Sequence, residues 1–138
     1  MNLRVPTLES VESVAENVPK LCKQLFNIEL DFSVDSVELL GKVIDSFPQA
    51  ESSEMIEKLN EPLVAIGCYV GEVIRRNFGG KWQDTSTVNG FPIGIKLGST
   101  YLNPVDKIIR RYKEGSEHNL TDYVRFAALM KVTFETTE

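Results

Sequence analysis

From Pro62 to Trp82 the chain reads PLVAIGCYVGEVIRRNFGGKW. Apolar side chains occupy most positions up to Phe78, a pattern typical of a central helix that is covered on several sides. Gly79-Gly80 then predicts the end of the helix, because glycine readily adopts the left-handed conformation that follows a last helical turn. Gly67 and Gly71 each cost about 1 kcal/mol relative to alanine within a helix. Their presence indicates that another element packs very closely here.

Helical spacing of apolar residues also marks the N-terminal segment, from about Leu8 to Leu25. Pro19 lies inside it, which predicts a kink or two short helices in line. The apolar residues of this predicted helix form a stripe at helical spacing: Val11, Val14, Val18, Leu21 and Leu25.

Two more helical runs lead to the central segment. The first begins at Ser33 and ends before Pro48, after residues 27–32, which alternate as in a short strand or an extended connector. The second starts near residue 52 or 53 and reaches Pro62. There the sequence permits either one kinked helix or a new helix that is capped by Asn60.

After Gly80 the apolar period changes from about 3.6 to 2, which predicts strands. Asn89-Gly90 is the signal of a two-residue type I′ hairpin turn, which would pair Trp82 with Leu97 and leave Thr85 on the solvent face. The core face of this hairpin would carry Trp82, Phe91, Ile93, Ile95 and Leu97. A short third strand is expected over residues 100–102.

Asn103-Pro104 opens a further helix that Gly115 ends, and a last helix begins near Thr121. No linker divides the chain. The sequence therefore predicts one α+β domain over residues 1–138, with helices packed on one face of a small antiparallel sheet from residues 81 to 102.

Composition excludes several classes of protein. The 138 residues are 42% apolar and 25% charged, as in ordinary globular domains. No signal peptide is evident and no segment approaches the roughly twenty apolar residues of a membrane helix, so we expect a cytoplasmic protein without membrane contact. The two cysteines, Cys22 and Cys68, lie in helical patterns and are interpreted as core residues.

Charge is distributed unevenly along the chain. The net charge is −5, yet residues 75–113 hold 8 basic and 2 acidic side chains, while residues 1–74 hold 5 and 13. The basic segment can indicate an anionic ligand or a nucleic acid. It can equally pack against the acidic N-terminal half, and this second interpretation is favoured because surface charges of mixed sign usually only solvate a fold.

Glu72 is the ionisable residue of the central helix that most needs an explanation. It stands three and four positions before Arg75 and Arg76, the spacing of same-face ion pairs, with Tyr69 one turn behind. A carboxylate held by arginine at the edge of a pocket would suit an acid or base of a small enzyme. An ordinary ion pair within the helix is the favoured interpretation, because such pairs are far commoner than catalytic ones.

The basic segment offers a second candidate surface. Trp82, Phe91 and Tyr101 could stack on bases beside its cations, but the first two also fall on the predicted core face of the hairpin, so nucleic acid is the less favoured partner. On the helix from Pro104 the outer face would carry Lys107, Arg110 and Arg111. With His118 as the single histidine, the sequence predicts no metal, no cofactor and no catalytic residue.

Residues 66–82, IGCYVGEVIRRNFGGKW, resemble a motif of an uncharacterised bacterial family of small α+β domains. In that family a Gly-x-Tyr-x-Gly-Glu helix ends in Gly-Gly-x-Trp and leads into a hairpin, then into a helix that starts at a proline. The segment LDFSVDSV at residues 30–37 is similar to an upstream segment of the family, and residues 103–115 to the helix that follows. The resemblance covers about residues 28–123 and implies the fold, but no activity.

The sequence therefore favours a non-enzymatic bacterial protein-interaction module, immunity-like or regulatory, whose partner is another protein. The alternatives are an anionic-ligand or nucleic-acid binding domain that uses residues 75–113, and a small enzyme that uses Glu72. The candidate binding residues are Tyr69, Glu72, Arg75, Arg76, Trp82, Lys107, Arg110 and Arg111.

Overall fold

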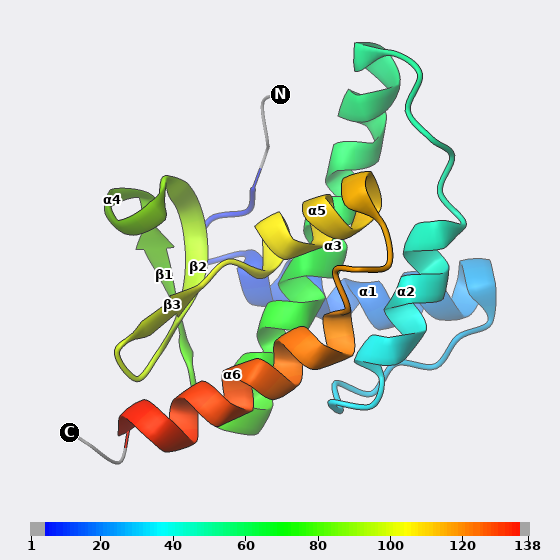
Figure 1. The fold of residues 1–138 in the computed structure, drawn as a ribbon. Helices are drawn as coiled ribbons and strands as arrows, with labels where there is room; N and C mark the ends of the chain where they lie inside the picture. The colour runs from blue at the N-terminus through cyan, green and yellow to red at the C-terminus, as the bar shows by residue number, and fades with distance from the viewer. Residues whose placement is uncertain (1–4, 136–138) are drawn as a thin grey trace.

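A computed structural model of the chain describes residues 5–135, with side chains up to residue 130. Its helices are α1 (Val11–Phe26), α2 (Val37–Asp45), α3 (Ser53–Phe78), α4 (Ser86–Asn89), α5 (Pro104–Glu114) and α6 (Leu120–Glu135). Its strands are β1 (Lys81–Thr85), β2 (Phe91–Leu97) and β3 (Thr100–Leu102), which form an antiparallel sheet in the order β1-β2-β3 (Figure 1). The predicted α+β class is confirmed.

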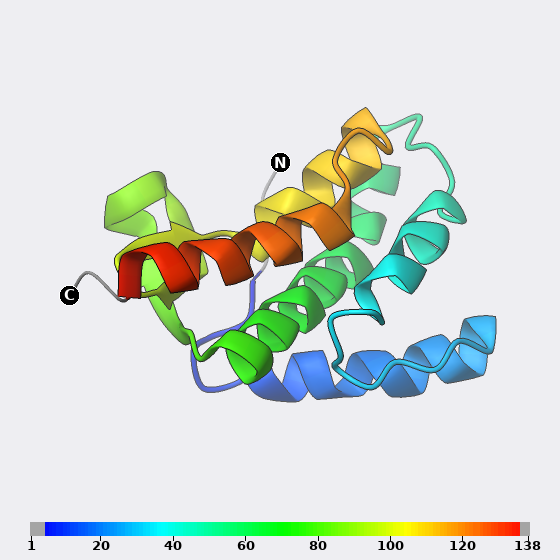
Figure 2. The ribbon, with the colours of Figure 1, turned by 60° about the horizontal axis from the view of Figure 1, so that its bottom comes forward.

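The helix α3 is the centre of the molecule. It runs between α1 on one side and α5 and α6 on the other, with the sheet at one end of the assembly (Figure 2). It is one continuous helix that contains Pro62, so no separate helix begins at Asn60. Ser52 caps its start by accepting the backbone N–H of Met55 at 3.2 Å. Gly79, with φ of 90°, ends it as the sequence predicts.

The two glycines of α3 mark close contacts, as expected. A Cβ atom added to Gly67 would lie 2.6 Å from the Cα atom of Val105 in α5. One added to Gly71 would overlap the indole ring of Trp82 in β1. These glycines therefore set how closely α5 and β1 approach the central helix.

The predicted hairpin register is wrong. Trp82 pairs with Ile95 rather than Leu97, and residues 86–89 form the short helix α4 in place of extended strand. A bulge between Gln83 and Thr85 turns Thr85 inward, where it is fully buried and its hydroxyl donates to the carbonyl of Phe91 at 2.8 Å. The prediction that Thr85 faces solvent is therefore wrong, because a bulge reverses the alternation of side chains along a strand.

The helix α1 buries only part of its apolar stripe. It is a single helix through Pro19, and the residues it buries are Val11, Ala15, Val18 and Cys22. The buried face is rotated relative to the predicted stripe, so Leu21 and Leu25 remain 42% and 71% exposed. The rotation follows from packing on α3, which the periodicity of α1 alone does not specify.

The two cysteines are buried and form no disulfide, which confirms their interpretation as core residues. Among the described residues, no helix combines the length and the apolar character required to cross a membrane.

Replacing Gly67 tests the close approach of α3 and α5. We expect Gly67→Ala to lower the free energy of unfolding by about 1–3 kcal/mol in urea titrations, because the new methyl group meets the backbone of Val105. Gly41→Ala in α2 is the matched control. Its Cβ would meet only the guanidinium of Arg111, at 3.5 Å, so the better helix propensity of alanine should leave stability unchanged or raised by up to about 1 kcal/mol. Equal effects of the two substitutions would contradict the packing account.

Candidate functional site

Glu72 lies on the central helix with its side chain completely buried. Its carboxylate accepts four hydrogen bonds. Arg75 donates from Nε to Oε1 at 2.6 Å and from Nη2 to Oε2 at 2.9 Å. Arg76 donates from Nε to Oε2 at 2.8 Å, and Trp82 from Nε1 to Oε1 at 2.8 Å. The predicted ion pairs of Glu72 are therefore present, and β1 supplies a further donor that the helical spacing does not predict.

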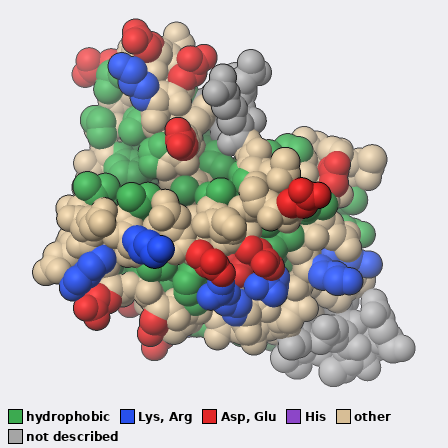
Figure 3. All heavy atoms as spheres, turned by 180° about the vertical axis from the view of Figure 1, so that it is seen from behind, with side chains coloured by type: hydrophobic (Ala, Val, Ile, Leu, Met, Phe, Trp, Pro, Cys, Tyr) green, Lys and Arg blue, Asp and Glu red, His purple; other side chains and the backbone are tan. Residues whose placement is uncertain are grey.

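Both arginines also form ion pairs with carboxylates of the helix α1. The Nη2 atom of Arg75 lies 3.2 Å from Glu12, and the Nη2 atom of Arg76 lies 3.2 Å from Glu16. Figure 3 views the molecule from behind, where acidic and basic side chains gather side by side across the middle of the face. The carboxylate thus links α3 to α1 through two shared guanidinium groups and to β1 through the indole N–H of Trp82.

Tyr69 does not join this cluster directly. Its hydroxyl accepts the backbone N–H of Phe32 at 2.9 Å and shares a hydrogen bond of 2.6 Å with Ser36. Phe32 has a φ of 62°, which is uncommon for a bulky residue, and the guanidinium of Arg76 lies 3.8 Å above its ring. Asn77 also donates to the carbonyl oxygen of Phe32 at 2.9 Å. Tyr69 therefore fixes the connection between α1 and α2.

The electrostatics of Glu72 keep it ionised. Burial raises the pKa of its carboxyl group, but the hydrogen bonds from Arg75, Trp82 and Arg76 outweigh this, and the net pKa is lowered. The hydrogen bond with Glu72 in turn raises the pKa of Arg75. Glu72 lines neither the pocket between α3 and α5 nor the pocket between α2 and the start of α6. A buried, fully hydrogen-bonded carboxylate holds structure together, whereas an acid or base must reach a substrate.

The cations of α5 are not gathered into one surface. Arg111 was predicted on the outer face of the helix, but it is only 7% exposed and binds Asp45 of α2 through two bonds of 2.9 and 3.0 Å. Arg110 pairs with Asp106 at 2.9 Å. The Nζ atom of Lys107 lies 3.2 Å from His118 Nδ1 and 5.6 Å from the centre of the Tyr123 ring.

The eight predicted site residues therefore fall into two groups. Tyr69, Glu72, Arg75, Arg76 and Trp82 lie together at the C-terminal half of α3, where their polar atoms bind one another or neighbouring elements. Lys107, Arg110 and Arg111 have separate partners along α5. Because Glu12, Glu16 and Asp45 all come from the N-terminal half, the basic middle segment does pack against the acidic half of the chain.

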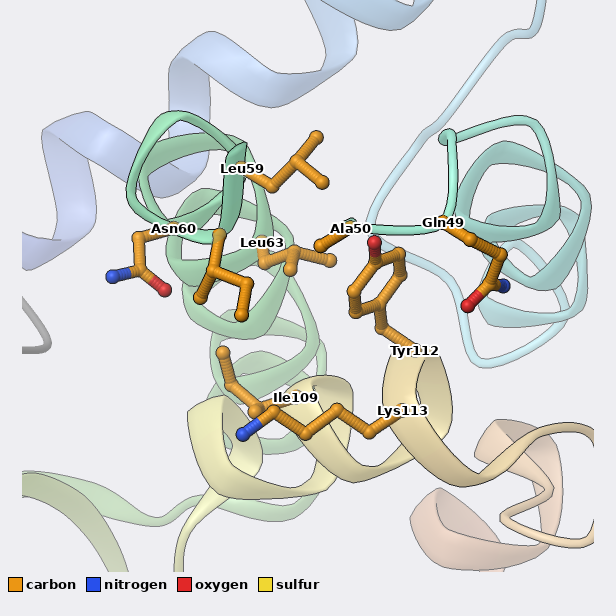
Figure 4. A pocket seen from close by; sticks show the side chains of 9 residues that line it. Gln49, Ala50, Leu59, Asn60, Leu63, Ile109, Tyr112 and Lys113 are labelled. Carbon is orange, nitrogen blue, oxygen red and sulfur yellow. The ribbon is translucent and has the colours of Figure 1, made fainter. Parts of the chain in front are cut away.

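A pocket of about 150 Å³ lies between the N-terminal half of α3, the α2–α3 connection and α5 (Figure 4). Its lining combines apolar side chains with four that carry polar groups. The lining residues are Gln49, Ala50, Ile56, Leu59, Asn60, Leu63, Ile109, Tyr112 and Lys113. A second pocket of about 140 Å³ lies beside Glu38 and Arg111, between α2 and the start of α6.

Sequence reasoning missed the first pocket. Its walls come from residues 49–63 and from residues 109–113, which are far apart in the chain, and the helical pattern assigns Ile109 and Tyr112 simply to the core. The available signal was at the start of α3, where Ile56 and Leu59 are apolar residues among charged neighbours and precede the densely apolar stretch.

Within the described part of the chain, no group of three or more histidine, cysteine, aspartate or glutamate side chains could hold a metal ion. Compared with protein families, curated proteins and solved structures, the chain shows no match in any of the three. The family resemblance of residues 28–123 therefore stays a prediction.

Replacing Glu72 tests its structural role. We expect Glu72→Gln to lower the free energy of unfolding by about 2–4 kcal/mol at neutral pH, because the donors of two arginines and Trp82 lose a buried charged acceptor. Glu16→Gln is the control. It removes only the exposed pair to Arg76 and should cost less than about 1 kcal/mol. Chemical denaturation measures both, and a loss for Glu72→Gln no larger than the control would refute the role.

The same pair of proteins predicts a pH dependence. Because folding lowers the pKa of Glu72 below its ordinary value of 4.5, its ionised form stabilises the fold above that value. The stability advantage of the wild type over Glu72→Gln should stay constant above about pH 5 and shrink as the pH falls through the folded-state pKa. Denaturation series at several pH values measure this difference, and an advantage that grows on acidification would contradict the assignment.

Proposed function

We propose that this chain is a non-enzymatic protein-interaction module whose partner surface is the C-terminal end of α1. One observation carries the proposal: three large apolar side chains on the last two turns of this helix face solvent. Leu21 is 42% exposed, Leu25 71% and Phe26 36%. Apolar side chains that cluster on a surface are typical of protein-binding sites.

The helix presents these side chains in a fixed geometry. Leu21 and Leu25 stand one turn apart and so lie on the same face. Asn27, in the left-handed conformation, closes the helix by donating its backbone N–H to the carbonyl of Lys23 at 3.1 Å. Lys23 and Glu29 form an exposed ion pair at 3.1 Å next to this end. An apolar centre with charged residues at its rim is the usual composition of a protein interface.

The internal pairing of charges supports the same proposal. The guanidinium groups of Arg75, Arg76 and Arg111 already have carboxylate partners, which leaves them poorly suited to phosphate. Trp82 donates to Glu72 and packs its indole ring against Gly71, so that side of the ring is not open to a base. The anionic-ligand and enzyme alternatives thus receive less support than a protein partner, and we infer that the chain acts in the cytoplasm as an immunity-like or regulatory module.

Site-specific photo-crosslinking tests the proposal. A photoreactive phenylalanine analogue at position 25 should capture a discrete protein in the cells that produce the chain. The same analogue at position 88, an apolar site on α4 that is 53% exposed, is the matched control. Adding Leu21→Glu should lower capture from position 25 by roughly tenfold or more, since burying one leucine contributes about 1.5–3 kcal/mol.

The free energy of unfolding of Leu21→Glu should stay within about 0.5 kcal/mol of the wild type, because the side chain is surface-exposed. This separates loss of binding from loss of fold. Capture that is equal at positions 25 and 88, or unaffected by Leu21→Glu, would overturn the proposal.

A further inference from the structure

The pocket beside the N-terminal half of α3 has the properties of a small-molecule site. Its space of about 150 Å³ is similar to that of cavities that admit a benzene ring. Ile56, Leu59 and Leu63 of α3 and Ile109 of α5 form its apolar floor. Figure 4 shows Leu59 and Leu63 on one side of the pocket and Ile109 on another. This floor would bind an apolar group by the hydrophobic effect alone.

The remaining wall is held in place. Tyr112, on α5, donates its hydroxyl hydrogen to the carbonyl of Pro48 at 2.6 Å, which fastens the α2–α3 connection to α5. On the other side of Gln49 and Ala50, Ser52 is fixed by its cap on α3. The connection is therefore anchored at both ends of its pocket-lining part, and a ligand need not order it.

The charge at the pocket has one sign. Lys113 is the only charged residue of the lining, and it forms no ion pair with any of the residues that the structure describes. Its side chain lies across α5, with the amino group beside Ile109 (Figure 4). The other three cations of α5 are engaged, Arg110 and Arg111 with carboxylates and Lys107 with His118.

We propose that this pocket binds a small organic acid, whose apolar body fills the space between α3 and α5 and whose carboxylate pairs with Lys113. The apolar floor supplies affinity, and the lysine selects an anion over a neutral molecule of the same shape. An apolar side chain of a protein partner would occupy the same floor without requiring the lysine. The proposal is independent of the surface on α1.

Titration of the isotope-labelled protein with benzoate, followed by ¹H–¹⁵N NMR, tests the site. We expect saturable shifts confined to the lining residues, with a dissociation constant of about 1–10 mM for a ligand of this size. Benzyl alcohol, which has the ring without the charge, should bind several-fold more weakly. Acetate, which has the charge without the ring, should produce no saturable shifts at the same residues.

Two substitutions separate the contributions of charge and shape. Lys113→Gln should weaken benzoate binding about three- to fivefold and leave benzyl alcohol unchanged, whereas Lys42→Gln, at an exposed lysine of α2, should change neither. Ala50→Phe should fill the pocket and abolish binding of both compounds. If its spectrum shows loss of fold, Ile56→Trp serves the same purpose from the wall formed by α3.

The proposal is overturned by any of three results. These are the absence of saturable benzoate shifts up to roughly 50 mM, well above the expected dissociation constant, shifts that lie outside the lining residues, and a benzoate affinity that Lys113→Gln leaves unchanged. If Lys113→Gln leaves benzoate affinity unchanged and benzyl alcohol still binds, the natural occupant of the pocket would instead be an apolar side chain of a protein partner.

Discussion

The buried carboxylate of Glu72 is the constraint on which most of this structure depends. Burying a carboxylate in the core of a protein is unfavourable unless its oxygen atoms are fully hydrogen-bonded. Here Arg75, Arg76 and Trp82 supply four hydrogen bonds. The two arginines belong to the same helix as Glu72, whereas Trp82 belongs to β1 and its bond restricts the position of that strand. The guanidinium groups then extend the restriction to α1. One residue thus couples the first helix, the central helix and the first strand.

The neighbouring glycines make this arrangement sterically feasible. Trp82 reaches Glu72 by passing over Gly71, where any side chain would occupy the space of the indole ring. Gly79, at φ of 90°, ends the helix so that β1 can begin within two residues and return toward it. The most conspicuous polar and small residues of the chain are therefore used in folding. Both binding regions proposed above lie on other surfaces.

Both proposed binding regions lie where helices extend beyond the shared core. The residues that α3 buries begin at Asn60, so its first two turns project from the body of the molecule and form one side of the pocket. The last turns of α1 likewise carry Leu21 and Leu25 on a face that no described element covers completely. The rigid core at the C-terminal half of α3 positions these extensions without occupying them.

The sequence alone determined the features that rest on neighbouring residues: the helix end at Gly79-Gly80, the helix between Pro104 and Gly115, the strand over residues 100–102 and the pairing of Glu72 with two arginines one turn away. Helical periodicity, caps and i,i+4 spacing act over a few residues and can be read locally. Tertiary structure alone decided the rotation of α1, the bulge that buries Thr85, the pairing of Arg111 with Asp45 and the pocket beside Lys113. Each of these depends on which distant segment packs against a given face, and that choice is a balance of long-range contacts that no local pattern encodes.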